Sequence, residues 1–153
     1  MKALELKVPP LLLVLLVGSL MWAASLLLAQ LNFAFKARLI IAGCLLISGF
    51  VVILAAVVSF RRASTTVNPV APDLASSIVT TGIYRYSRNP MYLGFLLVLA
   101  AWAVMLSHIL AFVLLPAYVV YMNRYQIRPE ERALKKKFGQ AFLNYKASVR
   151  RWL

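Results

Sequence analysis

The sequence predicts an all-α protein integral to a membrane, with four transmembrane helices, the last two forming a hairpin, and a C-terminal amphipathic helix on the cytoplasmic side. Two observations lead to this fold class. Hydrophobic residues make up 63 % of the 153 residues and charged residues only 14 %, whereas about 25 % of the residues in soluble proteins are charged. The ranges 8–35, 39–60 and 89–123 contain no Asp, Glu, Lys or Arg, and about 20 apolar residues cross a bilayer.

The first two uncharged ranges each predict one transmembrane helix, Pro9–Leu31 and Leu39–Phe60. The first follows Lys2 and Lys7 in the manner of a signal peptide, but its apolar core is longer than the roughly 7–15 residues of a secretory signal. We therefore expect it to remain as a helix. The only cysteine, Cys44, lies in the second range, where we interpret it as an apolar packing residue.

A polar segment, Arg61–Asn89, separates the second helix from the third uncharged range. It is rich in Ser, Thr and Pro and contains the turn-forming pairs Asn68-Pro69 and Pro72-Asp73. It ends at Asn89-Pro90, which predicts a helix start with Asn89 as the N-cap and Pro90 at the first helical position.

The third uncharged range predicts a tight helical hairpin. Its helices are expected at Met91–Leu106 and Ile109–Tyr125, with the turn at Ser107-His108, the one polar break in the range. The alternative is a single tilted helix kinked at Pro116.

The distribution of basic residues favours the hairpin. With four spans, both termini and the segment Arg61–Asn89 share one side of the membrane, and that side carries 15 of the 17 Lys and Arg residues. Only Lys36 and Arg38 lie opposite. Because cytoplasmic loops are enriched in Lys and Arg, we expect a multi-pass protein with both termini in the cytoplasm.

The tail from Pro129 onward predicts a further helix. Its apolar residues recur at spacings that place them on one helix face, namely Leu134, Phe138, Ala141, Phe142, Tyr145 and Val149. Lysines fill much of the opposite side. This pattern favours an amphipathic helix along the cytoplasmic interface or over the end of the bundle, with Gly139 as a weak point.

The net charge of +13 is explained by binding to anionic membrane lipids rather than to nucleic acid, since no nucleic-acid-binding motif is present. Nucleophile triads, phosphate-binding loops and metal-ligand clusters are also missing. His108 is the only histidine, and as a turn residue it is interpreted as structural. Redox, zinc and hydrolase chemistry are therefore not expected.

Two polar clusters, residues 80–92 and 124–132, are expected on the same membrane face. Arginines and tyrosines at helix ends are common interface anchors, and Glu130-Glu131 suit the first turn of a helix. These two residues are nonetheless half of the four acidic residues in the chain. Their position among arginines predicts a polar pocket at the interface.

At these residues the sequence resembles the isoprenylcysteine carboxyl methyltransferases and the related membrane phospholipid methyltransferases. The family pattern is Gly-x-Tyr, then Arg-(His/Asn)-Pro-x-Tyr opening a helical hairpin, then Glu-Glu followed by spaced Leu, Phe-Gly, aromatic and Val positions. The matching residues run from residue 65 to the C-terminus and are Gly82, Tyr84, Arg88-Asn89-Pro90-Met91-Tyr92, Glu130-Glu131, Leu134, Phe138-Gly139, Phe142, Tyr145 and Val149.

The resemblance implies that S-adenosylmethionine is the methyl donor and that the tail closes its pocket. Carried over by position, the expected cofactor-binding residues are Ser76, Ser77, Ile78, Val79, Tyr84, Arg88, Asn89, Pro90, Met91, Tyr92, Glu130 and Glu131. A carboxylate such as Glu130 suits the cofactor ammonium, tyrosines suit its cationic and polar groups, and Arg88 suits its carboxylate.

The methyl acceptor is expected to be lipophilic, reaching the site sideways from the lipid. An isoprenylcysteine-like carboxylate, or another hydrophobic carboxylate or thiol, is the first expectation, and a phospholipid amine is the alternative. The family's prenylcysteine enzymes have an arginine linked to the substrate carboxylate where this chain has Gln126, and His-Pro where it has Asn89-Pro90. Gln126, Arg124 and Arg128 are the candidate substrate-binding residues. A lipid-binding scaffold without catalysis is the alternative from another class.

The chain is expected to form one membrane domain. Residues 1–60 supply two scaffold helices, which match the family only in being hydrophobic. Residues 61–153 supply the cofactor-binding core and the tail.

Overall fold

The computed structural model describes residues 5–33, 36–63 and 77–153, and this part of the chain is helical. The elements are α1 (Pro10–Leu27), the 3-10 helix η2 (Ala29–Leu31), α2 (Arg38–Arg62), the 3-10 helix η4 (Gly82–Arg85), α3 (Pro90–Leu106), α4 (Ile109–Tyr121), the π-helix η5 (Met122–Ile127) and α5 (Arg128–Ser148). Among the described helices, α1 and α2 are long and apolar enough to cross a membrane, and α3 is a shorter apolar helix. The predicted all-α class is confirmed.

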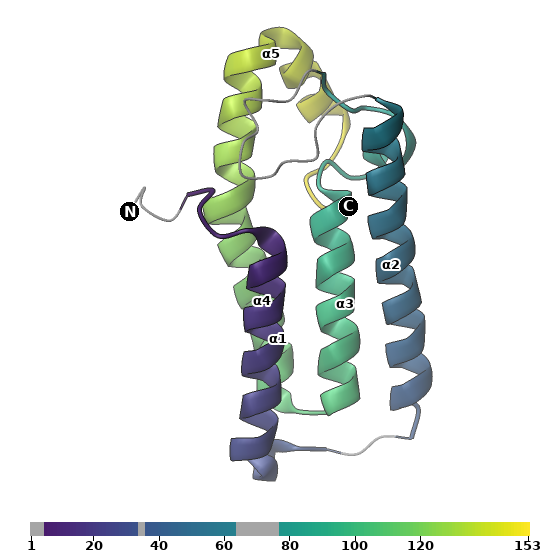
Figure 1. Cartoon of the computed structure of the whole chain (residues 1–153), viewed down its shortest axis with the longest axis vertical. Helices are drawn as coiled ribbons and strands as arrows, with labels where there is room; N and C mark the ends of the chain where they lie inside the picture. Colours follow the sequence, from purple (N-terminus) through teal and green to yellow (C-terminus); the bar gives the residue numbers. More distant parts are fainter. Residues whose placement is uncertain (1–4, 34–35, 64–76) are drawn as a thin grey trace.

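Helix α3 is the centre of the bundle, with α1 and α2 on either side of it and α4 next to α1 (Figure 1). Helices α2 and α3 cross closely at Gly49 and Gly94. A Cβ atom at Gly94 would lie 2.5 Å from Ile53 Cγ1 and 2.9 Å from the Gly49 carbonyl oxygen. The absence of two side chains therefore lets these helices approach closely.

The predicted hairpin is confirmed. Helices α3 and α4 are separated by Ser107 and His108, and Ser107 adopts a left-handed conformation with φ 51° that reverses the chain. The single tilted helix is wrong, and α4 continues through Pro116 without a break. The end of α1 is attached to this turn, because His108 Nε2 lies 3.1 Å from the Leu28 carbonyl oxygen and the Phe33 amide donates to Ser107 O at 2.9 Å. His108 has the structural position expected of it.

Helix α5 begins as a continuation of α4 through η5 and extends beyond the ends of α2 and α3 (Figure 1). It is broken at Gly139, where φ is 54° and the backbone is not helical. After this break the chain returns toward the bundle, and Phe142 and Tyr145 are buried. The predicted tail helix is present; its position along a membrane interface stays a prediction.

Candidate functional site

The polar residues at the start of α3 meet the junction between α4 and α5. The π-helix η5 joins these two helices without a loop. A π-helix shifts the helix face on which the following side chains lie, and such segments are frequent at functional sites. Gln126 and Ile127 are buried in η5, whereas the flanking Arg124 and Arg128 are exposed. The π-helix therefore places Gln126 in the interior.

Three side chains form a hydrogen-bonded group at this junction, which we call the Tyr92–Gln126–Glu130 cluster. Gln126 Nε2 donates to Glu130 Oε1 at 2.6 Å, and the Tyr92 hydroxyl donates to the same oxygen. Gln126 Nε2 also lies 3.4 Å from the Tyr92 hydroxyl oxygen. Tyr92 and Gln126 are 5 % and 2 % exposed, and Glu130 is partly buried. The cluster thus links α3, η5 and α5.

Within the described part of the chain, the carboxylate of Glu130 is held by two neutral donors, Tyr92 and Gln126. No Lys, Arg or His in the described ranges forms an ion pair with it. Burial raises the pKa of Glu130 from 4.5 to about 7, even though the hydrogen bonds from Tyr92 and Gln126 lower it. Glu130 therefore changes its charge near neutral pH, and its ionised form has no positive partner among the described residues. A perturbed carboxyl group of this kind is typical of functional sites.

The neighbouring Glu131 has the opposite environment. Its carboxylate forms ion pairs with Arg88 at 3.0 Å, Arg151 at 2.8 Å and Lys146 at 3.4 Å. Burial acts to raise the pKa of Glu131, but the hydrogen bond from Arg151 and the three positive charges outweigh it, so the pKa is lowered. Glu131 is therefore ionised at neutral pH and already neutralised by the protein. Its role is to join α3, α5 and the C-terminal segment.

The C-terminal segment, residues 149–153, lies against the start of α3. The Arg88 amide donates to Arg150 O at 3.0 Å, and Asn89 Nδ2 donates to Arg151 O at 2.9 Å. Asn89 is the residue before α3, as predicted, but its side chain makes no capping bond to the helix. Trp152 Nε1 donates to Asn123 Oδ1 at 3.2 Å. The segment thereby closes the space between α3 and η5.

The segment around η4 forms a second wall beside the start of α3. Val79 and Tyr84 are buried against Ala56 of α2, and Met91 packs on this group. Tyr145 of α5 donates its hydroxyl hydrogen to Tyr84 O at 2.8 Å. Burial raises the pKa of Tyr145 to about 12 and also raises that of Tyr84, so both phenols are protonated at neutral pH.

A glycine allows η4 to pack against the end of α2. Gly82 has φ 62°, and a Cβ atom there would lie 2.6 Å from Ser59 Oγ. Only glycine combines this backbone conformation with this close approach. The Gly82-x-Tyr84 part of the family pattern therefore has a structural reason.

The structure brings most of the predicted site residues to one end of the bundle. The residues of this group that α3, η4, η5 and α5 place together are Tyr84, Arg88, Asn89, Pro90, Met91, Tyr92, Gln126, Glu130 and Glu131. Val79 packs beside them, and Ser77 Oγ lies 3.5 Å from Ala63 O at the end of α2. Ser76 lies outside the described residues.

Arg124 and Arg128 are not brought to the buried side of the cluster. Both are exposed, whereas Gln126 between them is buried, and the Arg124 guanidinium lies over the Tyr125 ring at 5.6 Å from its centroid. Substrate binding by Arg124, Arg128 and Gln126 stays a prediction.

Arg151 and Trp152 were not predicted as part of the site, because in the sequence they count only as the end of a basic tail. Periodicity gives no information on a non-helical segment that reaches a distant element. The available signal was the tryptophan itself, because a Trp N–H usually finds a hydrogen-bond partner when it is buried.

Fold and site define a membrane-associated helical protein with a partly buried carboxylate at one end of the bundle. Residues 37–141 match the family described as phospholipid methyltransferase, and the chain belongs to this family. The predicted resemblance is confirmed: a membrane methyltransferase of the phospholipid and isoprenylcysteine type is the class to which the protein belongs.

Two relatives extend this result. The chain is 30 % identical over 105 residues to Protein-S-isoprenylcysteine O-methyltransferase A of Arabidopsis thaliana, covering 69 % of this chain and 53 % of the plant protein. It thus spans about half the length of that relative. It is 43 % identical over 63 residues to an uncharacterized protein of Haemophilus influenzae, covering 41 % of this chain and all of that protein. No solved structure is significantly similar to the chain.

Proposed function

We propose that the protein is an S-adenosylmethionine-dependent methyltransferase that acts on a lipophilic acceptor where α3 and α5 begin. Family membership supports methyl transfer. The single observation that supports this cofactor and this place is the environment of Glu130, a carboxylate with neutral donors and no positive partner among the described residues. Such a group suits a cationic ligand.

The residues of the site fit the chemistry of S-adenosylmethionine. Its ammonium group would pair with Glu130, since a charge-assisted hydrogen bond is about twice as strong as a neutral one. Its carboxylate would accept from Arg88, whose Nε is buried and has no hydrogen-bond partner in the described part of the chain. Tyr92 would face the cationic part of the ligand.

Further contacts are proposed on both sides of Arg88. The start of α3 would contribute Asn89, Pro90 and Met91, and the preceding segment would contribute Ser76, Ser77, Ile78, Val79 and Tyr84. Glu131 would need to release a cation before it could contact the ligand, because three cations already surround it. We therefore propose that Glu131 positions Arg88.

When bound, S-adenosylmethionine supplies a methyl group on a positively charged sulfur. The protein mainly has to align the acceptor with this methyl group and to exclude water. Glu130 binds and orients the ammonium group of the ligand, and Tyr92 and Gln126 hold the carboxylate of Glu130 in place. The buried Val79, Tyr84 and Tyr92 keep water from the site.

For the acceptor we propose a hydrophobic carboxylate of the isoprenylcysteine type, or another hydrophobic carboxylate or a thiol that reacts as its thiolate, because an anionic nucleophile needs no general base. The exposed Arg124 and Arg128 would attract such an anion. A phospholipid amine is the second candidate, favoured by the neutral Gln126 at the position where the prenylcysteine enzymes have an arginine. An amine must first lose a proton.

We also propose four spans with both termini in the cytoplasm. Helix α3 has 17 residues, and α4 with 13 residues is continued by the six residues of η5. At 1.5 Å per residue, each arm is roughly 25–28 Å long, close to the hydrocarbon thickness of about 30 Å. Residues 61–153 would then form the methyltransferase core, and residues 1–60 the scaffold.

Binding of S-adenosylhomocysteine, the demethylated product, to detergent-purified protein tests the proposal by titration calorimetry. Saturable binding is expected for the wild type, and at least about thirtyfold weaker binding for Glu130→Gln, the ratio for a loss of about 2 kcal/mol. Glu5→Gln is the matched control, because Glu5 pairs with the exposed Arg132 outside the site. Absence of saturable binding by folded wild-type protein would favour a non-catalytic lipid-binding scaffold and sink the proposal.

A further inference from the structure

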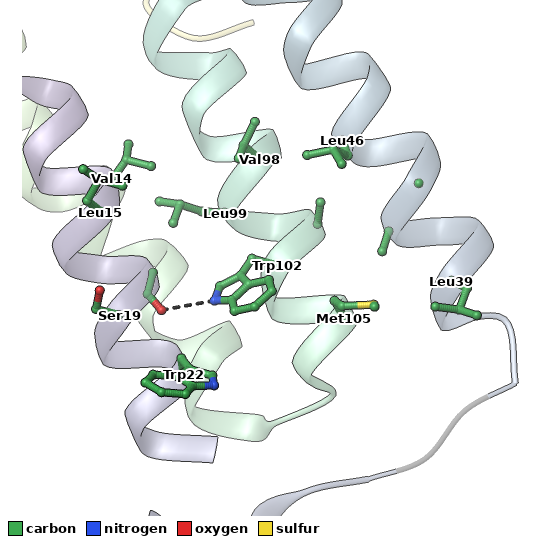
Figure 2. A pocket seen from close by; sticks show the side chains of 14 residues that line it. Val14, Leu15, Ser19, Trp22, Leu39, Leu46, Val98, Leu99, Trp102 and Met105 are labelled. Atoms are coloured by element: carbon green, nitrogen blue, oxygen red, sulfur yellow. Dashed lines mark hydrogen bonds between the residues drawn. The ribbon is translucent and has the colours of Figure 1, made fainter. Parts of the chain in front are cut away.

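A groove with a volume of about 710 Å³ lies between α1 and α2, with α3 as its floor (Figure 2). This volume falls within the range of about 300–1,000 Å³ that is typical of ligand pockets. The groove is separate from the Tyr92–Gln126–Glu130 cluster, since its lining begins at Val98 and Leu99 of α3 and runs to Met105. Neither the proposed cofactor contacts nor the family assignment gives it a role.

The lining of the groove suits hydrocarbon. Its side chains are almost all apolar, and Trp102 Nε1, a polar group in the lining, already donates to the Gly18 carbonyl oxygen at 3.1 Å (Figure 2). Two walls are the helices α1 and α2, which are apolar enough to cross a membrane. In the bilayer interior such a groove does not suit a polar ligand, because its polar groups would have no hydrogen-bond partners.

Two glycines keep the groove open. A Cβ atom at Gly43 of α2 would meet no atom within 4 Å, and one at Gly18 of α1 would meet only Leu99 and Trp102 at 3.9 and 4.0 Å. The space is therefore not used for packing between helices, unlike the close crossing of α2 and α3.

One face of α3 connects the groove with the site. Met91, Phe95, Val98, Trp102 and Met105 follow one another at helical spacing and so lie on one stripe. Met91 is in the first turn, beside Tyr92, and the last three residues line the groove. At 1.5 Å per residue the groove begins about 10 Å from Met91 and ends about 20 Å from it. One lipid tail reaches through half of the hydrocarbon core, about 15 Å. This depth falls between the two ends of the groove, so a tail whose head lies near Met91 can reach it.

We propose that this groove holds the hydrocarbon tail of the methyl acceptor, whose reactive end lies at the Tyr92–Gln126–Glu130 cluster. The inference rests on the proposed function, and it adds that the enzyme selects acceptors by tail length. A short tail ends before Val98, whereas a long tail fills the space beside Gly43 and Trp102.

Quenching of the fluorescence of Trp22 and Trp102, which both line the groove, tests the proposal directly. The protein carries Trp152→Phe, and the probes are N-acetyl-S-alkylcysteines of increasing chain length with a terminal bromine. Saturable quenching is expected only for the long probes. The larger side chain of Gly43→Leu would occupy part of the groove, so the long probes should bind about tenfold more weakly. Val51→Phe is the control, because Val51 is 58 % exposed on the same helix and does not line the groove.

Each outcome decides the proposal. Saturable, chain-length-dependent quenching that Gly43→Leu weakens and Val51→Phe preserves supports it. Equal quenching by short and long probes, or equally strong quenching by a brominated phosphatidylcholine, overturns it, the latter by assigning the groove to bulk lipid. Calorimetry with S-adenosylhomocysteine on the same preparations keeps the two proposals apart: intact binding without specific quenching refutes the groove assignment alone.

Discussion

Gln126 donates from its side-chain amide to the same carboxylate oxygen of Glu130 that accepts from the hydroxyl of Tyr92. Both donors are neutral, so they orient the carboxylate without cancelling its charge. The result is a group that changes its protonation near pH 7, placed where three elements meet. Several consequences of this arrangement are measurable.

Affinity for S-adenosylhomocysteine is expected to rise with pH. The pKa of Glu130 is about 7 in the free protein, and the ammonium group of the ligand pairs with the ionised form of Glu130, so affinity should approach a plateau above this pH. Below it, affinity should fall by up to about tenfold per pH unit. Calorimetry between about pH 5.5 and 7.5 measures this, and Glu130→Gln should show weak binding with a flat profile. A wild-type profile as flat as that of the variant contradicts the assignment.

The substitution Gln126→Leu should move this pH profile upward. The hydrogen bond from Gln126 lowers the pKa of Glu130, so its removal raises the pKa further and weakens binding at neutral pH by about two- to tenfold. Affinity should recover at higher pH. Gln140→Leu is the matched control, since Gln140 bonds to Asn144 on the exposed part of α5. If both variants behave alike, Gln126 does not tune Glu130.

Much of the fold follows from the sequence because its cause is local. The hairpin was predicted from a single polar break, and the structure shows why it suffices: Ser107 takes the left-handed conformation that reverses the chain. The π-helix η5 was not predicted, because an insertion of one residue in a continuous helix leaves no turn-forming signal in the sequence. Its effect, the burial of Gln126 between two exposed arginines, depends on packing against α3.

Only part of the candidate site could be predicted, because the sequence carries information on local spacing and not on contacts between distant segments. Arg88, Tyr92 and Glu130 lie at helix starts within motifs, where spacing carries information. Glu131 of α5 forms an ion pair with Arg151 of the C-terminal segment. No periodic pattern in the sequence brings these two residues together. The difference between Glu130 and Glu131 also needs the structure, since adjacent carboxylates on a helix point to different surroundings.

Removal of the Glu131 carboxylate should destabilise the fold. Glu131→Gln leaves Arg88 and Arg151 without their anion, and the side chain of Arg88 is only 9 % exposed. The expected loss is about 2 kcal/mol, typical of hydrogen bonds to charged groups. Lys146→Gln removes the longest and most exposed of the three ion pairs and should cost less than about 1 kcal/mol. Equilibrium unfolding in one detergent compares them, and equal losses argue against the described network.

Alanine substitution of Gly94 on α3 and of Gly43 on α2 should change the stability of the fold in different ways, because Gly94 is closely packed and Gly43 has open space beside it. In Gly94→Ala the new Cβ atom would lie 2.5 Å from Ile53 Cγ1, so the helices must move apart, and we expect a loss of about 1–3 kcal/mol. Gly43→Ala places its Cβ in open space and replaces a poor helix former, so it should be neutral or stabilising by up to about 1 kcal/mol. Equilibrium unfolding of both variants in the same detergent measures the difference. A Gly94→Ala protein as stable as Gly43→Ala would mean that α2 and α3 do not cross at Gly49 and Gly94.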